Sequence, residues 1–498
     1  MVDPNLGKHS GLRFGLLLLL TAASLLVHGY HPFAEDAEIY LPGVEKILHP
    51  ELFPAGTEFF QSHAHLTLFP NLIALSVRIT HLPLEVALML WYGASIFLLL
   101  LGCWQLSRRL FSTARARWSA VAMVAALLTL PVAGTALYIM DQYTNPRNLA
   151  AFAGVFAITR TLERKYVRAG LWLVFAGSVH PLMAVFAFSF CSLWIAMERF
   201  DHGAARPDGI PVKASLAFLL PVISLAPPTS PAYHAAAMRH GFHYIQFWKW
   251  YEVLGAIAPA ALFWWFGRIA RARQWQELHL LCRALIAYNL IYFIAALIVD
   301  FPARFESLAR LQPLRSLHLL YILMFVVIGG LAGEFVLKDK VWRWLALFIP
   351  LSAGMFAAQR ALFPANAHVE WPEAAFRNPW EQAFFWIRGN TPADALFALD
   401  PLFMQLPGEG ATGFRCLAQR SRLADDTKDS GAVSMFPPLA EKWWAQVRAQ
   451  SPWQNFRLED FARLKQNYGV TWVVVQQPSG AGMECDYQNG AVKVCRLP

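Results

Sequence analysis

Three carboxylates in segment 31–40 (HPFAEDAEIY) are well placed to carry out acid–base chemistry. Glu35, Asp36 and Glu38 follow directly after the first long apolar stretch, so we expect them at a membrane surface. A water-poor groove there would raise the pKa of a carboxyl group and let it act as a general base toward a hydroxyl group. Acids are also favoured near a helix N-terminus, so the same residues could instead begin a helix over 39–48.

A second group of reactive residues lies in segment 141–147 (DQYTNPR). Asp141 and Arg147 flank a turn set by an Asn-Pro pair, so either could face the same groove as the first acids. The planar guanidinium of Arg147 can grip two phosphate oxygens, which makes Arg147 and the neighbouring Tyr143 candidates for substrate binding. The alternative is that Asp141 and Arg147 form an ion pair that closes the loop.

Further candidate phosphate ligands are the arginines of the predicted outer loop 300–318, Arg304, Arg310 and Arg315. A basic group at a membrane interface attracts an anionic head group by about 1 kcal/mol. We favour Arg315 for a substrate phosphate because it adjoins an apolar stretch, although ordinary phospholipids would use the same residues. His180, beside Pro181, interrupts another apolar stretch and could bind substrate, ligate a divalent metal or relay protons, the alternative being packing at the interface.

The elements that must position these residues are membrane helices. The chain has 498 residues, 56% hydrophobic and 15% charged, where soluble proteins have about 25% charged residues. Repeated apolar stretches predict an α-helical polytopic membrane protein with about eleven transmembrane helices in residues 1–363. The predicted spans are 12–30, 84–107, 118–138, 146–162, 171–179, 181–197, 214–227, 253–267, 278–299, 316–337 and 344–363. Residues 66–80 are apolar but short, and they predict an interfacial or re-entrant helix.

The distribution of charge predicts the orientation. The net charge is +9, yet 13 basic and 14 acidic residues follow position 363, so the excess lies in the membrane part and gives no indication of nucleic-acid binding. Basic residues concentrate in the loops on the side of the N-terminus, whereas the outer loop 31–65 is acidic. The positive-inside rule therefore predicts a bacterial inner-membrane protein with a cytoplasmic N-terminus and a periplasmic C-terminal domain.

Residues 364–498 predict a small soluble α/β domain. Helix-like stretches cover 379–388 and 458–468, and β-prone stretches cover 395–399 and 471–476. An Asn-Gly pair at 489–490 predicts a β-hairpin. Cys485 and Cys495 flank this hairpin and could form a disulfide in an oxidising compartment, if the hairpin has a bulged register that places them opposite each other.

The layout of a first helix, an acidic outer loop with Glu35-Asp36, further spans and an outer C-terminal domain resembles the GT-C superfamily of membrane glycosyltransferases. The resemblance implies that Asp36, or next Glu35, is the catalytic base and that the sugar donor is a polyprenyl phosphate. The chain departs from the superfamily in two places. The acidic pair stands in the order Glu-Asp, where the superfamily has Asp-Glu or Asp-Asp, and Trp443-Trp444 is followed by Ala445, where the oligosaccharyltransferase signature has Asp.

The expected function is transfer of a sugar from a polyprenyl-phosphate-linked donor to a glycan, lipid or protein acceptor on the periplasmic side. Asp36 would deprotonate the acceptor, and Arg147 or Arg315 would hold the donor phosphate. A divalent metal (Mg²⁺ or Mn²⁺) could bridge Asp36 and that phosphate. The alternatives are a transporter, a lipid-handling protein or a scaffold without catalysis. Few charged residues interrupt the apolar stretches and no internal repeat is visible, which argues against a transporter.

Overall fold

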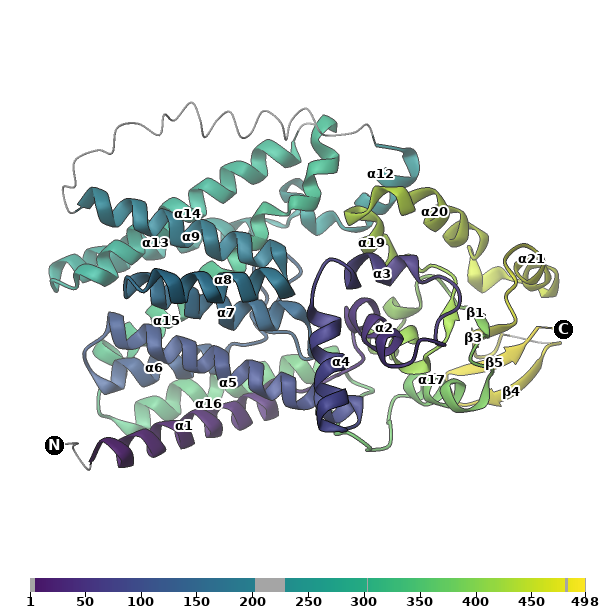
Figure 1. Cartoon of the computed structure of the whole chain (residues 1–498), viewed down its shortest axis with the longest axis horizontal. Helices are drawn as coiled ribbons and strands as arrows, with labels where there is room; N and C mark the ends of the chain where they lie inside the picture. The colour runs from purple at the N-terminus through teal and green to yellow at the C-terminus, as the bar shows by residue number, and fades with distance from the viewer. Residues whose placement is uncertain (1–4, 202–228, 302, 480–481, 498) are drawn as a thin grey trace.

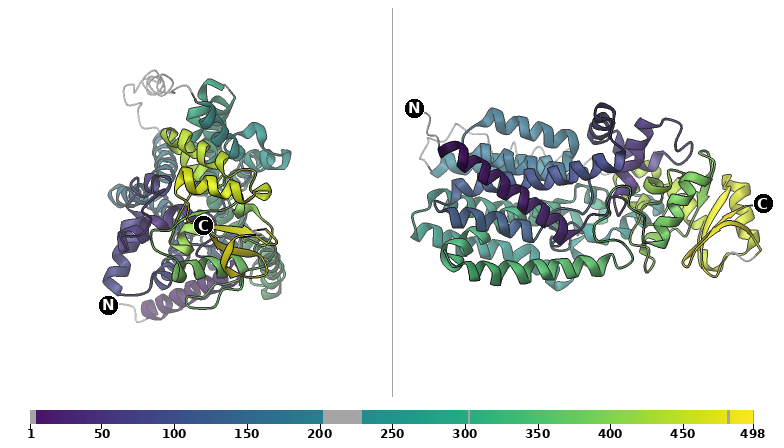
Figure 2. Two further views of the ribbon diagram at one scale, coloured as in Figure 1. Left: turned by 90° about the vertical axis from the view of Figure 1, so that its right-hand side faces the viewer. Right: turned by 90° about the horizontal axis from the view of Figure 1, so that it is seen from below.

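The computed structural model describes residues 5–201, 229–301, 303–479 and 482–497. It consists of a bundle of long helices with a smaller domain of helices and one sheet at one end (Figure 1). Figure 2 shows the long helices of the bundle running along the longest axis, with the C-terminal sheet beyond one end and the N-terminus at the opposite end.

Seven helical segments of the described chain are long and apolar enough to cross a membrane. They correspond to α1 (Asn5–His28), α5 (Leu84–Leu110), α9 (Pro181–Asp201), α13 (Trp250–Ala272), α14 (Gln276–Asp300), a continuous stretch Phe305–Leu337 and α16 (Val341–Leu362). The stretch Phe305–Leu337 combines η3 (Ala303–Leu311), η4 (Pro313–Ser316), α15 (Leu317–Leu331) and η5 (Ala332–Leu337). Its most apolar window is 72% buried, whereas that of α16 is only 6% buried, so α15 is central and α16 is peripheral.

The other predicted spans are shorter helices or lie elsewhere. α7 (Pro146–Leu162) and α8 (Tyr166–Val179) pack against each other, with α7 buried almost throughout and α8 exposed along one side. The predicted interfacial segment is the helix α4 (Phe69–Thr80), which at 12 residues is too short to cross a bilayer. The predicted span 214–227 lies outside the described residues.

The predicted span 118–138 is wrong in its second half. The helix α6 (Ala114–Ala126) ends after 13 residues, and the chain then forms an irregular segment in which Pro131 and Tyr138 make a single β-bridge. Pro131 cannot donate a helical hydrogen bond, and Ala133 and Ala136 adopt positive φ angles. The irregular backbone replaces half of a span and lines the cavity described below.

The end of the bundle nearest the C-terminal domain is called its outer end here, and residues 31–80, whose short helices lie between the two (Figure 1), are called the first outer segment. These short helices are α2 (Ala37–Leu48), α3 (Glu58–Ala64) and α4. Later in the chain, α12 (Pro231–Arg239), η1 (Gly241–His243) and η2 (Ile245–Phe247) lie at the same level. The helix α12 contacts the C-terminal domain: its Tyr233 belongs to the same buried cluster as Val433 and Trp443.

The C-terminal domain contains a five-stranded mixed sheet of strand order β2-β1-β3-β5-β4. The strands are β1 (Leu396–Ala398), β2 (Ser421–Arg422), β3 (Trp472–Gln476), β4 (Glu484–Gln488) and β5 (Val492–Arg496). β1 is parallel to β2 and β3, whereas β5 is antiparallel to β3 and β4. The helices are α17 (Pro379–Asn390), α18 (Phe414–Ala418), α19 (Asp429–Met435), α20 (Ala440–Ala449) and α21 (Leu458–Tyr468), with single turns η6 (Phe403–Gln405), η7 (Pro437–Leu439) and η8 (Trp453–Asn455).

The C-terminal domain is continuous with the bundle in its apolar core. Phe33 and Ala37 of the first outer segment belong to the same buried cluster as Phe384 and Phe414 of the C-terminal domain. The small sheet domain predicted from the sequence is therefore present, and it is packed firmly against the outer end of the bundle.

Cys485 and Cys495 form a disulfide across the hairpin. A bulge between Cys485 and Tyr487 shifts the register so that the two cysteines stand directly opposite each other. The bulged alternative is thus the register that the structure adopts.

We expect mass mapping of the unreduced protein to recover the peptides of Cys485 and Cys495 as one linked species. The bulged register brings the two thiols together, and an oxidising compartment would keep them joined. The other four cysteines are buried and free, so they serve as an internal control. Recovery of Cys485 and Cys495 as two free thiols would contradict the pairing.

Candidate functional site

A cavity of about 1290 Å³ lies between the outer end of the bundle and the C-terminal domain. Its wall comes from the first outer segment, the irregular segment after α6, the junction of α8 and α9, the η3–η4 segment and two loops of the C-terminal domain. Of the residues predicted for the site, it brings together Glu35, Asp36, Asp141, Tyr143, Arg147, His180, Arg310 and Arg315.

Asp36 occupies the N-terminus of α2, but its side chain does not cap the helix. The carboxylate lies between two cations, with Arg147 Nη1 at 2.8 Å and Lys428 Nζ at 2.9 Å. The preceding Glu35 adopts a positive φ of 56° and also reaches Lys428 Nζ, at 2.5 Å. Asp36 is therefore directed into the cavity as an ion-pair partner, and helix capping does not account for its side chain.

Arg147 belongs to the first turn of α7, which Asn145 begins by accepting a hydrogen bond from the Asn148 backbone N–H. Its Nη2 donates to Asp141 Oδ2 at 2.8 Å while its Nη1 donates to Asp36. Asp141 and Arg147 therefore close their loop, as one alternative predicted, and the same guanidinium also holds Asp36. Tyr143 is close by, with its hydroxyl 3.4 Å from Arg147 Nη2.

These pairs fix the charge of Asp36. Burial by itself would raise the pKa of the Asp36 carboxyl, but the charges and hydrogen bonds of Lys428 and Arg147 outweigh burial and hold this pKa well below its usual range. For the Lys428 ammonium the directions are reversed. Burial by itself would lower its pKa, but the negative charges of Asp36 and Glu35 outweigh burial and raise this pKa above its usual value. Asp36 is thus a carboxylate and Lys428 an ammonium at any physiological pH.

Arg315 is a different kind of cation from Arg147. It lines the cavity from η4, and its Nε is buried without a hydrogen-bond partner among the described residues. His243 of η1 also lines the cavity and carries a buried Nε2 with no partner in the described chain. This side of the cavity therefore offers donor groups that an anionic ligand could use. Arg304 begins the same η3–η4 region, but its side chain lies outside what the structure describes.

Lys428, which comes from the loop between β2 and α19, is not among the predicted site residues. Neither is a second contact across the cavity rim, in which Arg239 Nε lies 2.9 Å from Asp426 Oδ2. A lysine within the run Asp-Asp-Thr-Lys-Asp at 425–429 is an ordinary surface pattern, and no local signal connects it with a carboxylate 392 positions earlier.

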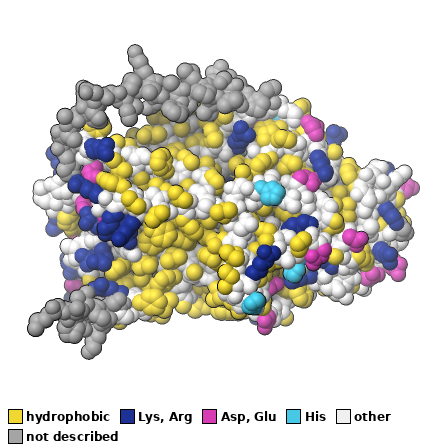
Figure 3. Space-filling model, viewed as in Figure 1, with side chains coloured by type: hydrophobic (Ala, Val, Ile, Leu, Met, Phe, Trp, Pro, Cys, Tyr) yellow, Lys and Arg dark blue, Asp and Glu magenta, His cyan; other side chains and the backbone are white. Residues whose placement is uncertain are grey.

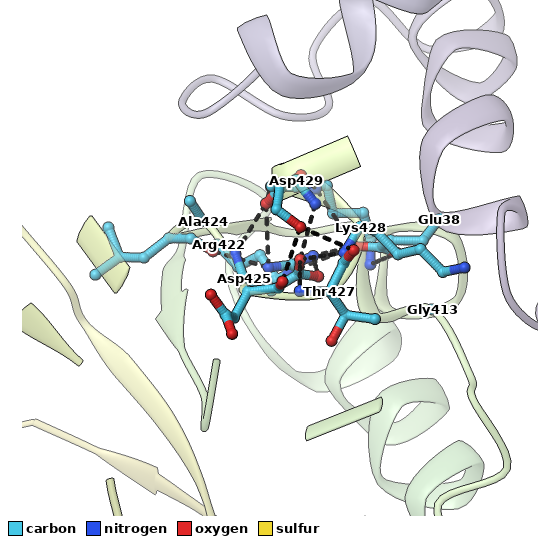
Figure 4. A network of polar contacts seen from close by, with 12 residues as sticks. Glu38, Gly413, Arg422, Ala424, Asp425, Thr427, Lys428 and Asp429 are labelled. Carbon is cyan, nitrogen blue, oxygen red and sulfur yellow. Dashed lines mark hydrogen bonds and ion pairs between the residues drawn. The ribbon is translucent and has the colours of Figure 1, made fainter. Parts of the chain in front are cut away.

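Glu38, one helical turn from the cavity, anchors the C-terminal domain to α2 (Figure 4). Its side chain is fully buried and accepts hydrogen bonds from Arg422 Nη2 at 2.8 Å and from the Arg415 backbone N–H at 2.7 Å. Gly413 makes room for it, because a Cβ there would lie 2.7 Å from Glu38 Oε2. Arg415 in turn makes a two-pronged ion pair with Asp429 at 2.8 Å.

The possible divalent metal at Asp36 stays a prediction, and the structure shows only how the carboxylate is paired without one. Mg²⁺ and Mn²⁺ prefer several oxygen ligands, and no three His, Cys, Asp or Glu side chains come together as a ligand group among the described residues. Both oxygens of Asp36 are already engaged by Arg147 and Lys428. In this arrangement the positive charges beside Asp36 are therefore those of Arg147 and Lys428.

The chain was compared with protein-family models and with curated proteins, and neither comparison gave a match. The assignment of the site therefore rests on its geometry: a carboxylate held between two cations in a large cavity at the end of a helical bundle.

Proposed function

We propose that this protein is a membrane glycosyltransferase that moves a sugar from a polyprenyl-phosphate-linked donor to a glycan, lipid or protein acceptor. The observation that carries the proposal is the combination, in the wall of one large cavity, of an ionised Asp36 and an Arg315 whose buried Nε has no hydrogen-bond partner among the described residues. Such a transfer needs a base for the acceptor hydroxyl and a positive group for the departing phosphate.

The proposed reaction is a single displacement. The acceptor oxygen attacks the anomeric carbon of the sugar while its proton passes to a carboxylate oxygen of Asp36. The bond between the anomeric carbon and the phosphate oxygen breaks, and its electron pair leaves with the phosphate. Arg315 and Arg147 stabilise the negative charge that develops on this leaving group. One displacement inverts the configuration at the anomeric carbon.

The remaining residues have positioning roles in this proposal. Asp141 binds Nη2 of Arg147 while Asp36 binds Nη1, so the guanidinium is held in one orientation at the cavity wall. Tyr143 and His180 contribute polar groups to the wall that could contact the sugar or the phosphate. No step is assigned to a metal, because Arg147 and Lys428 already supply positive charge beside Asp36.

We place the cavity on the periplasmic side of a bacterial inner membrane. In support, the face of the molecule seen in Figure 3 is largely apolar along the bundle, and Lys and Arg side chains gather at the end away from the C-terminal domain. The last turn of α5 carries Arg108 and Arg109, and the last turn of α13 carries Arg271. By the positive-inside rule this end faces the cytoplasm, which puts the C-terminal domain outside.

The test is a transfer assay with the full chain reconstituted in lipid and a panel of polyprenyl-phosphate sugars. We expect Arg315→Ala to raise KM for the donor roughly tenfold or more, because a charge-assisted contact to phosphate is lost. Arg168→Ala is the matched control, since Arg168 is exposed on α8 and is not part of the cavity wall.

Equal kinetics for Arg315→Ala and the wild type would remove Arg315 from the donor site. If the wild type binds polyprenyl phosphates but releases no sugar from any donor, the better description is a lipid-handling or scaffold protein that has this architecture without the chemistry.

A further inference from the structure

The loop that carries Lys428 belongs to the C-terminal domain, yet its ammonium group forms part of the wall around Asp36. The Lys428 side chain is only 12% exposed and lies within 2.9 Å of a carboxylate oxygen of both Glu35 and Asp36. Both acids belong to the first outer segment. The candidate site is therefore assembled from two parts of the chain that are almost 400 residues apart.

The position of Lys428 is set by a rigid loop (Figure 4). Asp425 Oδ1 accepts hydrogen bonds from the backbone N–H groups of Thr427, Lys428 and Asp429, at 3.0, 2.6 and 2.8 Å. Asp425 also pairs with Arg422, which holds Glu38 of α2. The backbone of Lys428 is thus fixed relative to α2, and only its flexible side chain is left to move.

The charges around Asp36 create a conflict for the proposed reaction. A base must take a proton, but two adjacent cations make Asp36 a very weak base while they remain beside it. A phosphate group competes for the same cations, because it offers several strongly accepting oxygens. Arg147 is also bound to Asp141, whereas the ion pairs of Lys428 within the described part of the chain are those with Glu35 and Asp36. Of the two cations, Lys428 is therefore the one that can leave Asp36 for a phosphate oxygen at the lower cost in free energy.

We propose that Lys428 is a substrate-binding residue that the C-terminal domain contributes to the site. With the cavity empty, its ammonium group pairs with Asp36 and Glu35. When a phosphorylated substrate enters, the ammonium group moves to a phosphate oxygen and leaves Asp36 free to accept the proton of the acceptor. This inference rests on the proposed function in one respect, namely that the cavity takes a phosphorylated ligand.

The inference is tested by measuring binding of farnesyl phosphate, a short polyprenyl phosphate, to the full chain in lipid nanodiscs. We expect Lys428→Met to weaken binding roughly tenfold or more, and Lys428→Arg to retain most of it because the charge is kept. The matched control is Lys442→Met. Lys442 also joins the C-terminal domain to the first outer segment, through Glu58 at 2.5 Å, but it is not part of the cavity wall.

A second readout separates binding from a merely structural role. In Lys428→Met, Asp36 of the substrate-free protein loses one of its two cations, so the acid limb of the kcat/KM–pH profile, which reports the free protein, should move to higher pH. Thermal unfolding of each variant shows whether the fold is kept. An unchanged acid limb, with the fold intact, would overturn the exchange of partners at Asp36.

The possible failures are distinguishable. Binding by Lys428→Met within twofold of the wild type would overturn the inference and leave the transferase proposal standing. Tight binding by the wild type that depends on Lys428, without transfer from any donor, would uphold Lys428 as a phosphate ligand and refute the transferase. Absence of binding by the wild type would overturn the inference.

Discussion

Asp36→Asn is expected to lower the rate of sugar transfer by about 10²–10⁴-fold, the range that a general base contributes. The carboxamide has nearly the same size and can still accept a hydrogen bond from Arg147, but it cannot take the proton of the acceptor. The rate is measured with the reconstituted chain, and thermal unfolding in the same lipid shows whether the protein stays folded.

Glu35→Gln is the matched control for this variant. Glu35 is the adjacent carboxylate and shares Lys428 with Asp36, but its side chain is 46% exposed and no contact joins it to Arg147 among the described residues. We expect Glu35→Gln to keep most of the activity. Full activity of Asp36→Asn, or equal losses in the two variants, would remove Asp36 from the role of base.

Glu38→Ala is expected to destabilise the junction between α2 and the C-terminal domain by about 3–5 kcal/mol, the usual cost of removing one partner from a buried ion pair. Two buried arginines, Arg415 and Arg422, would lose a carboxylate that is fully buried between them. The measurement is the rate at which a protease releases the C-terminal domain, together with the unfolding temperature. Glu441→Ala, an exposed acid of α20, is the control.

The outcome for Glu38→Ala also reports on the cavity. Arg422 holds both Glu38 and Asp425, and Asp425 fixes the backbone of Lys428. We therefore expect activity to fall together with stability. A variant as stable as the wild type would show that the two arginines are satisfied by Asp425 and Asp429 without Glu38.

Elements with strong local signals were predictable from the sequence. The helix over 458–468 was predicted with the bounds that α21 has in the structure, because it begins with acids, carries an amphipathic pattern and ends at Gly469, which adopts a positive φ. Asn145-Pro146 likewise marked the start of α7. Most long apolar stretches correspond to helices for the simple reason that a lipid-facing segment must satisfy its own backbone hydrogen bonds.

The error at 118–138 shows where hydropathy fails. Residues 127–138 are apolar enough to suggest a continued span, but they are buried inside the protein as irregular backbone. Composition alone cannot separate lipid-facing from protein-facing apolar residues, and the one local sign was Pro131. Irregular backbone at such a place is tolerated only where protein or a cavity surrounds it.

The candidate site was predictable only in its local part. Asp36, Asp141 and Arg147 could be proposed because each lies in a polar segment next to an apolar one. The partners from the C-terminal domain could not, since pairing Glu38 with Arg422 or Asp36 with Lys428 depends on how two distant parts of the chain pack. Charged residues give no pairing signal in a single sequence.

The burial of Glu38 among arginines of the C-terminal domain has a consequence for biosynthesis. Residues 31–65 are made early, while the ribosome still has most of the chain to make, and Arg415 and Arg422 follow only near the end of translation. Until then, Glu38 of the nascent protein lacks both of these arginine partners. A message truncated before codon 415 would accordingly yield a bundle whose outer end stays open, a ready substrate for quality-control proteases.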